Sequence, residues 1–121
     1  MSEEKVFKVG GVELHAENRS LGADGGPSVR VFAEVENKPV QLLRFDCFRK
    51  DPHYHYDPSG KNQMYHLDQT TTPDTVGWTI SQLGSRLQAM IRRAGYDAVA
   101  EKVDQGAVKA VLPQVEAVMR G

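Results

Sequence analysis

The sequence contains a single cysteine, Cys47, and no apolar run that approaches the length of a membrane span. One cysteine excludes an intramolecular disulfide and is typical of a reducing compartment. Residues 1–5 are acidic and polar, without the basic start and apolar stretch of a secretory signal peptide. Because a membrane helix needs about 20 apolar residues, these absences predict a cytoplasmic protein that does not associate with a membrane.

An excess of charge of one sign is also lacking. The chain has 15 basic and 16 acidic residues, so its formal net charge is −1 and provides no long-range attraction for phosphate groups. The densest basic group is Arg86, Arg92 and Arg93, and on a helix such residues usually form a solvated face. We therefore do not expect nucleic-acid binding, although a local basic patch would permit it.

Motifs that would identify an enzyme are absent as well. There is no Gly-rich phosphate loop, no Cys pair for a metal and no Gly-x-Ser-x-Gly elbow. Cys47 lies in an apolar segment, which predicts a buried small hydrophobe rather than a nucleophile. The 121 residues, 40% apolar and 26% charged, suit one folded domain that spans residues 1–121.

The first half of the chain has the period-two alternation of a sheet. Residues 6–16 are predicted to form a hairpin, residues 17–27 a polar loop, and residues 29–36 a half-buried strand. In the next predicted strand, 40–49, one face carries Leu43, Phe45 and Cys47, and the other carries Val40, Leu42, Arg44, Asp46 and Phe48. Both faces are partly apolar, so we expect this strand to be central.

Helical spacing follows over residues 76–94, after the start signal Thr72-Pro73-Asp74 with Thr72 as the capping hydroxyl. In the C-terminal helical segment, Pro113 is expected either to kink the helix or to begin a new one. Strands first and helices afterwards indicate the α+β class rather than a parallel fold. We predict a meander-like antiparallel sheet of five to six strands at about 5–68, with two or three helices at about 73–120 packed on one face.

A turn at Asp57-Pro58-Ser59-Gly60 separates two segments rich in histidine and tyrosine, 53–56 and 63–67. If this hairpin is symmetric about the Ser59-Gly60 pair, His53 lies opposite His66. A slip of one residue would turn one set of side chains to the other face of the sheet. The hypothesis therefore depends on register.

Three imidazoles would share one face in this register, because alternate residues of a strand point the same way. His53, His55 and His66 could then bind a divalent ion such as Zn²⁺, with a fourth position open to water or substrate. Asp46 or Asp68 would be a further ligand, would orient the ligands, or would act as a general base. Without a metal, a histidine pair can act as general base and general acid on an ester or phosphodiester.

The candidate catalytic residues are His53, His55, Asp46 and Arg44, since Arg44 and Asp46 share a face and can pair there. The candidate ligand-binding residues, which can stack on a base or bind a phosphate, are Tyr54, Tyr56 and Tyr65. The simpler alternative is an exposed or edge strand whose histidines and tyrosines hydrogen-bond locally. Trp78 is expected to belong to the core.

The block Arg44-Phe45-Asp46-Cys47-Phe48, followed by Pro52-His53-Tyr54-His55-Tyr56, resembles a family of small bacterial proteins of unknown function over residues 40–105. Members have this block and then a helix that opens near a tryptophan, here Trp78. That resemblance implies a bacterial protein but no established activity. A fainter resemblance, at Arg44, Asp46, His53 and His55, is to small toxins of prokaryotic toxin–antitoxin pairs, which place such residues on strands before a helix.

The sequence favours a non-enzymatic binding or accessory domain whose His/Tyr hairpin is a ligand or partner surface. The alternative is a small metal- or His-dependent hydrolase, RNase-like and of the toxin type, that acts through His53, His55 and His66. An apolar patch at Val40, Leu42 and Phe48 would favour a homodimer, because such patches usually have a partner. A different protein partner is the other expectation.

Overall fold

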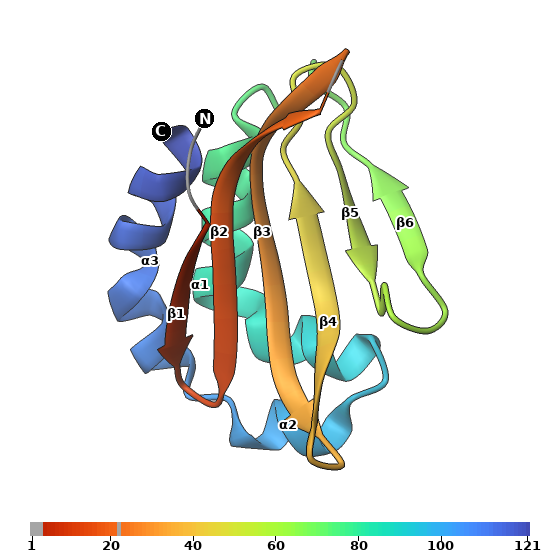
Figure 1. The fold of residues 1–121 in the computed structure, drawn as a ribbon, viewed down its shortest axis with the longest axis vertical. Coiled ribbons are helices and arrows are strands. Elements are labelled where there is room, and N and C mark those ends of the chain that lie inside the picture. Colours follow the sequence, from red (N-terminus) through yellow and green to blue (C-terminus); the bar gives the residue numbers. More distant parts are fainter. Residues whose placement is uncertain (1–3, 22) are drawn as a thin grey trace.

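The computed structural model describes residues 4–21 and 23–121, which form six strands followed by three helices. The strands are β1 (Lys5–Val9), β2 (Val12–Leu21), β3 (Asp24–Val35), β4 (Lys38–Asp46), β5 (His53–Tyr56) and β6 (Gln63–His66). The helices are α1 (Thr75–Arg93), α2 (Asp97–Lys102) and α3 (Gln105–Arg120). Each strand pairs with the next in an antiparallel meander, β1-β2-β3-β4-β5-β6, so the predicted α+β class and strand order are confirmed (Figure 1).

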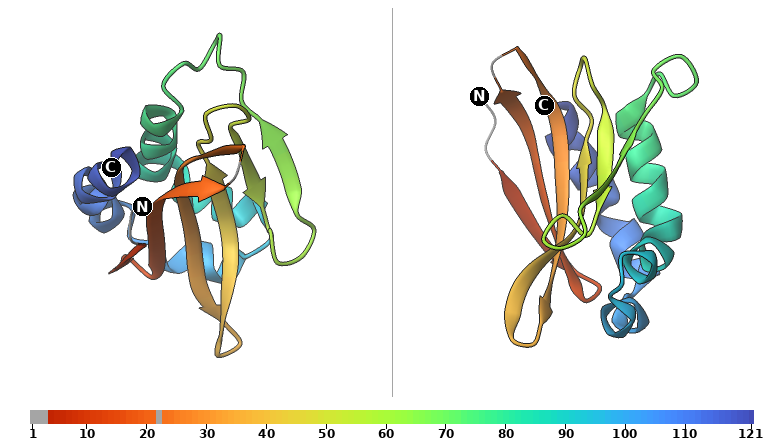
Figure 2. Two further views of the ribbon diagram at one scale, coloured as in Figure 1. Left: turned by 45° about the horizontal axis from the view of Figure 1, so that its top comes forward. Right: turned by 90° about the vertical axis from the view of Figure 1, so that its right-hand side faces the viewer.

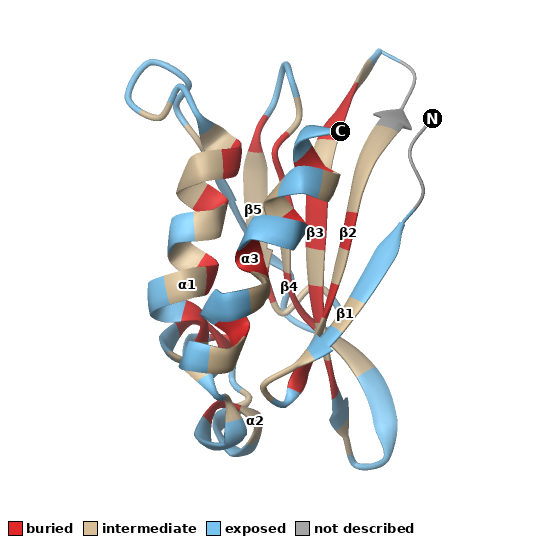
Figure 3. Ribbon diagram, turned by 90° about the vertical axis from the view of Figure 1, so that its left-hand side faces the viewer, coloured by how far each residue is buried: buried red, intermediate tan, exposed pale blue. Residues whose placement is uncertain are grey.

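The molecule has two layers, because the helices all pack on the same face of the sheet (Figure 2). Helix α1 lies against β4 and β5, whereas α3 lies against β1, β2 and β3. The buried residues of strands and helices face each other between the layers (Figure 3). Leu14, Val31 and Phe45 of the sheet and Leu83, Ile91 and Val115 of the helices belong to this core. The opposite face of the sheet is left open by the helices.

The polar segment predicted as a loop, 17–27, instead extends β2 and β3. Their pairing continues to Leu21 and Asp24. Gly25 and Gly26 lie within β3 because neighbouring backbone approaches them closely: the Arg49 amide donates to the Gly25 carbonyl at 2.9 Å. A Cβ at Gly26 would lie 2.9 Å from the Cys47 carbonyl oxygen. Glycine in this strand therefore marks a close backbone contact rather than a loop.

The face assignment predicted for Leu42 is wrong. In the pairing of β3 with β4, Val31 lies opposite Leu43 while Phe32 lies opposite Gln41, so Leu42 is an extra residue of β4. A bulge of this kind interrupts strict alternation. Leu42 is fully buried in the same hydrophobic core as Leu43. Beyond the bulge, Val40 pairs with Ala33 and also packs against the core. The apolar patch expected on the open face therefore lacks two of its three members, and homodimerisation stays a prediction.

Helix α1 begins two residues later than its start signal predicts. Asp74, not Thr72, is the N-cap, and its carboxylate accepts a hydrogen bond from the Gly77 amide at 3.0 Å. A carboxylate suits this position because it satisfies an unpaired amide of the first turn.

In α3, by contrast, the helix continues through Pro113 from Gln105 to Arg120. None of the described helices is both long and apolar enough to cross a membrane.

Candidate metal site on the open sheet face

The predicted register of the His/Tyr hairpin is confirmed. His53 lies opposite His66 and Tyr56 lies opposite Gln63 in the pairing of β5 with β6. The tyrosines of β5 pack on the helix side, where Tyr54 contacts Trp78, and alternation places His53 and His55 on the open face. One short strand thus presents imidazoles on one side and phenols on the other.

The strands beside β5 add polar residues to the same row. Asp46 of β4 lies between His53 of β5 and Ser28 of β3, and Arg44 lies opposite His55. Directly opposed residues of neighbouring antiparallel strands share a face and lie close together. The antiparallel register therefore gathers an acid, a hydroxyl, a guanidinium and two imidazoles within one patch of the open face.

Asp46 is the centre of this patch. Its side chain is only 2% exposed, and burying a carboxylate is costly unless it is paired and hydrogen-bonded. Ser28 Oγ donates to its Oδ1 at 2.9 Å. Arg44 Nε lies 3.1 Å from Oδ1 and 2.9 Å from Oδ2. These partners compensate the buried charge and hold the carboxylate in one orientation.

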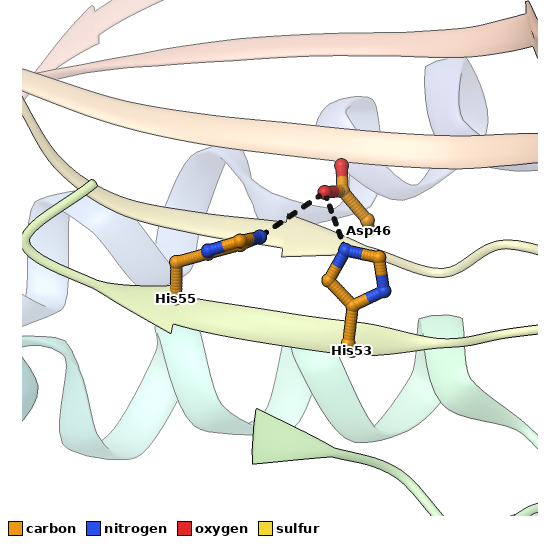
Figure 4. A group of neighbouring side chains, drawn as sticks. All are labelled: Asp46, His53 and His55. Carbon is orange, nitrogen blue, oxygen red and sulfur yellow. Dashed lines mark ion pairs between the residues drawn. The ribbon is translucent and has the colours of Figure 1, made fainter. Parts of the chain in front are cut away.

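Both imidazoles direct the same nitrogen at this carboxylate (Figure 4). Nε2 of His53 lies 3.1 Å from Asp46 Oδ2, and Nε2 of His55 lies 3.7 Å from the same oxygen. The other ring nitrogens face oxygen acceptors: Nδ1 of His53 lies 2.8 Å from the Asp51 carbonyl, and Nδ1 of His55 lies 2.8 Å from Asn62 Oδ1. An Nδ1–H that donates to these oxygens leaves the Nε2 lone pair of a neutral ring facing Asp46.

Burial favours this neutral form for His55. Desolvation lowers the pKa of His55 below its ordinary value, more than the hydrogen bond to Asn62 raises it. A neutral ring places an electron pair, not a proton, at Nε2. If His53 is neutral as well, two imidazole lone pairs and a carboxylate oxygen converge on one small space, which is the chemistry of a cation site.

Asp46, His53 and His55 form a group whose possible ligand atoms all lie within 4.8 Å of one another. Two imidazoles and one carboxylate are a ligand set found at zinc and non-haem iron sites, where the remaining coordination positions stay open. Asp46 comes from β4 and the two histidines come from β5, so the set is assembled by strand pairing rather than by a local motif.

His66 was predicted as the third metal ligand, but it does not belong to this group, although its ring lies beside that of His53 with the centroids 5.9 Å apart. Although it faces His53 in register, its Nδ1 lies 2.8 Å from Asp51 Oδ1, and its side chain is 59% exposed. Asp46 occupies the place that the sequence hypothesis gave to His66. Cross-strand pairing sets the backbone position of a residue, but the side-chain torsions and the nearby loop decide where its ring points.

Ser28, Asp51 and Asn62 were not anticipated. Ser28 carries no signal of its own, because its role follows only from the pairing of β3 with β4. Asn62 follows the turn at Gly60 and adopts a left-handed conformation with φ of 51°, which asparagine tolerates better than most residues. An asparagine at the end of a hairpin turn is the one local signal that was available.

The tyrosines predicted to bind a ligand gather on the helix side of β5 and β6. The rings of Tyr54 and Tyr65 stack with centroids 5.5 Å apart, and Tyr54 lies 5.1 Å from Trp78. Trp78 packs against the core, as predicted, but it also lines a cavity of about 320 Å³ with Tyr54 and Tyr56. The histidine patch and the tyrosine cluster are therefore separate places on opposite faces of one hairpin.

A larger cavity, of about 820 Å³, lies at the other end of the sheet. Its lining includes the Gly10-Gly11 turn, Glu36 and residues of α2 such as Lys102. The lining includes no histidine and no cysteine, so cavity size does not identify the place with the most reactive chemistry. We therefore take the histidine patch as the candidate site.

A family model described as a domain of unknown function, DUF7700, matches residues 6–119. No curated protein and no solved structure matches the chain. The match covers nearly the whole of the chain and is consistent with an uncharacterised family. It gives no support to the toxin resemblance or to a bacterial origin, which stay predictions.

Proposed function

We propose that this chain, which belongs to the DUF7700 family of domains of unknown function, is a binding domain that holds a divalent metal ion on the open face of its sheet and captures an anionic ligand with it. Asp46, His53 and His55 are the metal ligands in this proposal. The observation that carries it is the orientation of the two histidines, whose Nδ1 atoms face oxygen acceptors while their Nε2 atoms face Asp46.

A proton is the competing occupant of this space. If His53 is an imidazolium, it donates from Nε2 to Asp46 and forms an ordinary ion pair at 3.1 Å. That pair would explain His53, but it leaves His55 unexplained, because Nε2 of His55 lies 3.7 Å from the carboxylate, beyond hydrogen-bond distance. A metal ion accounts for both rings, since each supplies one lone pair to it.

The charge of the site favours an anionic ligand. Asp46 and Arg44 cancel each other, and the Asp51 carboxylate lies 3.9 Å from His53 Nδ1. A divalent ion would therefore leave the patch with a net charge of about +1. Arg44 contacts Asp46 through Nε, and its Nη groups have no hydrogen-bond partner among residues 4–21 and 23–121. Three protein ligands also leave coordination positions open. A carboxylate or phosphate can fill those positions and accept hydrogen bonds from Arg44.

The decisive experiment measures metal binding by the chelator-treated protein. We expect calorimetry with ZnCl₂ to show one site per chain, and we expect His55→Gln to abolish it. His66→Gln is the matched control, because it removes a histidine of the same hairpin that is not one of the three proposed ligands, and it should bind like the wild type. Thermal unfolding without metal checks that both variants fold. Equal binding by the wild type and His55→Gln, or no binding by the wild type, would overturn the proposal.

A second candidate function is the hydrolysis of phosphoesters by the same site. The open coordination positions favour it, because a metal ion can activate water there and Arg44 can stabilise negative charge as it develops. The test is metal-dependent turnover of bis(p-nitrophenyl) phosphate and of a single-stranded RNA. Turnover that disappears in His55→Gln but not in His66→Gln would establish a hydrolase. Metal binding without turnover of either substrate would support the binding domain and exclude hydrolysis of these two substrates.

A further inference from the structure

The cavity on the helix side of the His/Tyr hairpin has a composition unlike that of the core. One wall consists of Tyr54 and Tyr56 of β5, and the facing wall is the side of α1 that carries Trp78. Its volume of about 320 Å³ lies at the lower end of the range for small-molecule sites. This cavity shares no residue with the candidate metal site.

Helix α1 contributes a row of side chains at helical spacing. Trp78, Gln82 and Arg86 follow each other four residues apart, and Ala89 and Arg93 continue the row. Residues three or four apart lie on the same face of a helix. The small side chain of Ala89 leaves room between the two arginines. The row thus runs from an aromatic ring at one end to a guanidinium at the other.

The two arginines of this row have no carboxylate partner within the part of the chain that the structure describes. Arg93 stacks on the ring of Tyr56 with its guanidinium carbon 4.5 Å from the ring centroid, and its Nη2 donates to Tyr65 Oη at 2.8 Å. These contacts orient the guanidinium without neutralising it. Arg86 lines the same cavity. An anion bound here would meet two positive charges and no competing acid.

The aromatic walls favour a flat ring. Tyr54 is half-buried and lies 5.1 Å from Trp78, with the two ring planes 46° apart. The Tyr54 ring stacks on the rings of Phe45 and Tyr65, so the partly exposed ring of Trp78 provides the stacking surface beside the cavity. Aromatic contacts of this kind add binding energy beyond the area they bury. A ligand that combines a flat ring with an anionic group would therefore match both ends of the cavity.

We propose that this cavity is a binding site for a small aromatic anion, whose ring stacks on Trp78 beside Tyr54 and whose carboxylate or phosphate is held by Arg86 and Arg93. Two classes of ligand combine a flat ring with an anionic group in this way: aromatic carboxylates and nucleoside monophosphates. This site does not depend on the metal proposed for the open face, because it uses the other side of β5.

Trp78 makes the proposal directly measurable, since it is the only tryptophan of the chain. We would titrate the full-length protein with benzoate and with AMP while exciting the tryptophan selectively. We expect a saturable change in Trp78 fluorescence with at least one of the two, and the compound that produces it identifies the class of ligand. Cyclohexanecarboxylate has the charge without the aromatic ring, and benzamide and adenosine have the ring without the charge, so none of the three should produce the change.

Variants then locate the site. Ala89→Leu should abolish binding because it fills the cavity, and an exposed helical position tolerates leucine. Arg93→Gln should weaken binding about tenfold or more, the usual effect of losing a hydrogen bond to a charged group. Arg92→Gln is the matched control, since Arg92 is an exposed neighbour that does not line the cavity. No saturable change with either probe, or unchanged binding by Ala89→Leu, would overturn the proposal.

Discussion

Asp46 lies opposite Ser28 on the neighbouring strand, and the Ser28 hydroxyl donates to its carboxylate at 2.9 Å. Both residues are almost completely buried, with Ser28 1% and Asp46 2% exposed. Burying a charged group costs free energy, and its hydrogen-bonded and oppositely charged partners offset that cost. The pair therefore connects the stability of the sheet to the orientation of the candidate metal site, since the same carboxylate faces both histidines.

Replacing Ser28 by alanine removes this donor and changes the volume of the buried side chain only slightly. We expect Ser28→Ala to lower the free energy of unfolding by about 1.5–3 kcal/mol, the cost of losing a hydrogen bond to a buried charge. Urea unfolding monitored by circular dichroism measures it. Ser85→Ala is the control, because the Ser85 hydroxyl is exposed on α1 and donates to the Ser81 carbonyl. Equal stability of both variants would contradict a role for Ser28 in holding Asp46.

Asn62 should tune the affinity of the metal site through His55. Asn62→Gly removes the acceptor of the His55 Nδ1–H. Glycine adopts the left-handed backbone conformation of this position, where φ is 51°, without strain. We expect zinc affinity to fall about 10- to 100-fold, as is usual when a partner that orients a ligand is lost. Asn62→Asp keeps an acceptor and makes it anionic, so its affinity should equal or exceed that of the wild type. Calorimetry at constant pH compares the three proteins, and indistinguishable affinities would show that Asn62 does not position His55.

The N-cap of α1 predicts an acid-sensitive contribution to stability. The Gly77 amide and then Arg120 lower the pKa of Asp74 below its ordinary value of 3.8. The folded state therefore favours the carboxylate, so this contribution is present above the unfolded pKa and is lost as the pH falls through the lower folded pKa. Asp74→Ala should cost about 1 kcal/mol at neutral pH.

Asp74→Asn is the informative control for this cap. Its side-chain oxygen can still accept from the Gly77 amide, but it carries no charge for Arg120. We expect Asp74→Asn to retain most of the stability at neutral pH and to lose less on acidification than the wild type. Unfolding curves at neutral and acidic pH test this. Parallel losses in the wild type and in Asp74→Asn would show that Asp74 does not contribute to the acid sensitivity.

Tyr96 should make the fold sensitive to alkali. Burial, followed by the hydrogen bond to Asp57, raises its pKa from the ordinary value of 10.0 to about 12. The Tyr96 hydroxyl donates to Asp57 Oδ1 at 2.5 Å. Because the folded pKa is raised, the contribution is fully present below the unfolded value of 10.0 and is lost as the pH rises toward about 12. Tyr96→Phe cannot ionise, so its stability should fall less steeply over this range, and similar slopes would refute the assignment.

Cys47 should be inert in the folded protein. Its side chain is buried, and burial raises the pKa of the thiol above its ordinary value of 9.0, more than the hydrogen bonds with Thr79 and Thr75 lower it. Since the thiolate is the reactive form, a disulfide reagent such as DTNB should react slowly with native protein and at once in denaturant. Rapid stoichiometric reaction of the native protein would mean that β4 and α1 open locally.

The predictions that succeeded rest on local rules. The turn at Asp57-Pro58-Ser59-Gly60 and the alternation beside it were enough to place His53 opposite His66. The helix period and the order of strands and helices were enough for the α+β class. Two of the failures share a cause, because Leu42 and Gly26 take their conformation from the backbone that packs beside them. The helix cap is different, since Thr72 and Asp74 are both local candidates and the carboxylate of Asp74 binds the Gly77 amide.

By itself, the sequence determined that His53 and His55 share one face of a strand and that Tyr54 and Tyr56 take the other, because strand alternation is a property of the backbone. Only the tertiary structure determined which side chains the histidines contact. Asp46 joins them because β4 pairs with β5 in one particular register. His66 lies beside His53 but is not part of the group, and its Nδ1 faces Asp51 instead. Likewise, α1 decided that the tyrosines face Trp78 and Arg93 across a cavity. Strand pairing and side-chain packing join residues that are distant in the chain, so one hairpin acquired two different chemical surfaces.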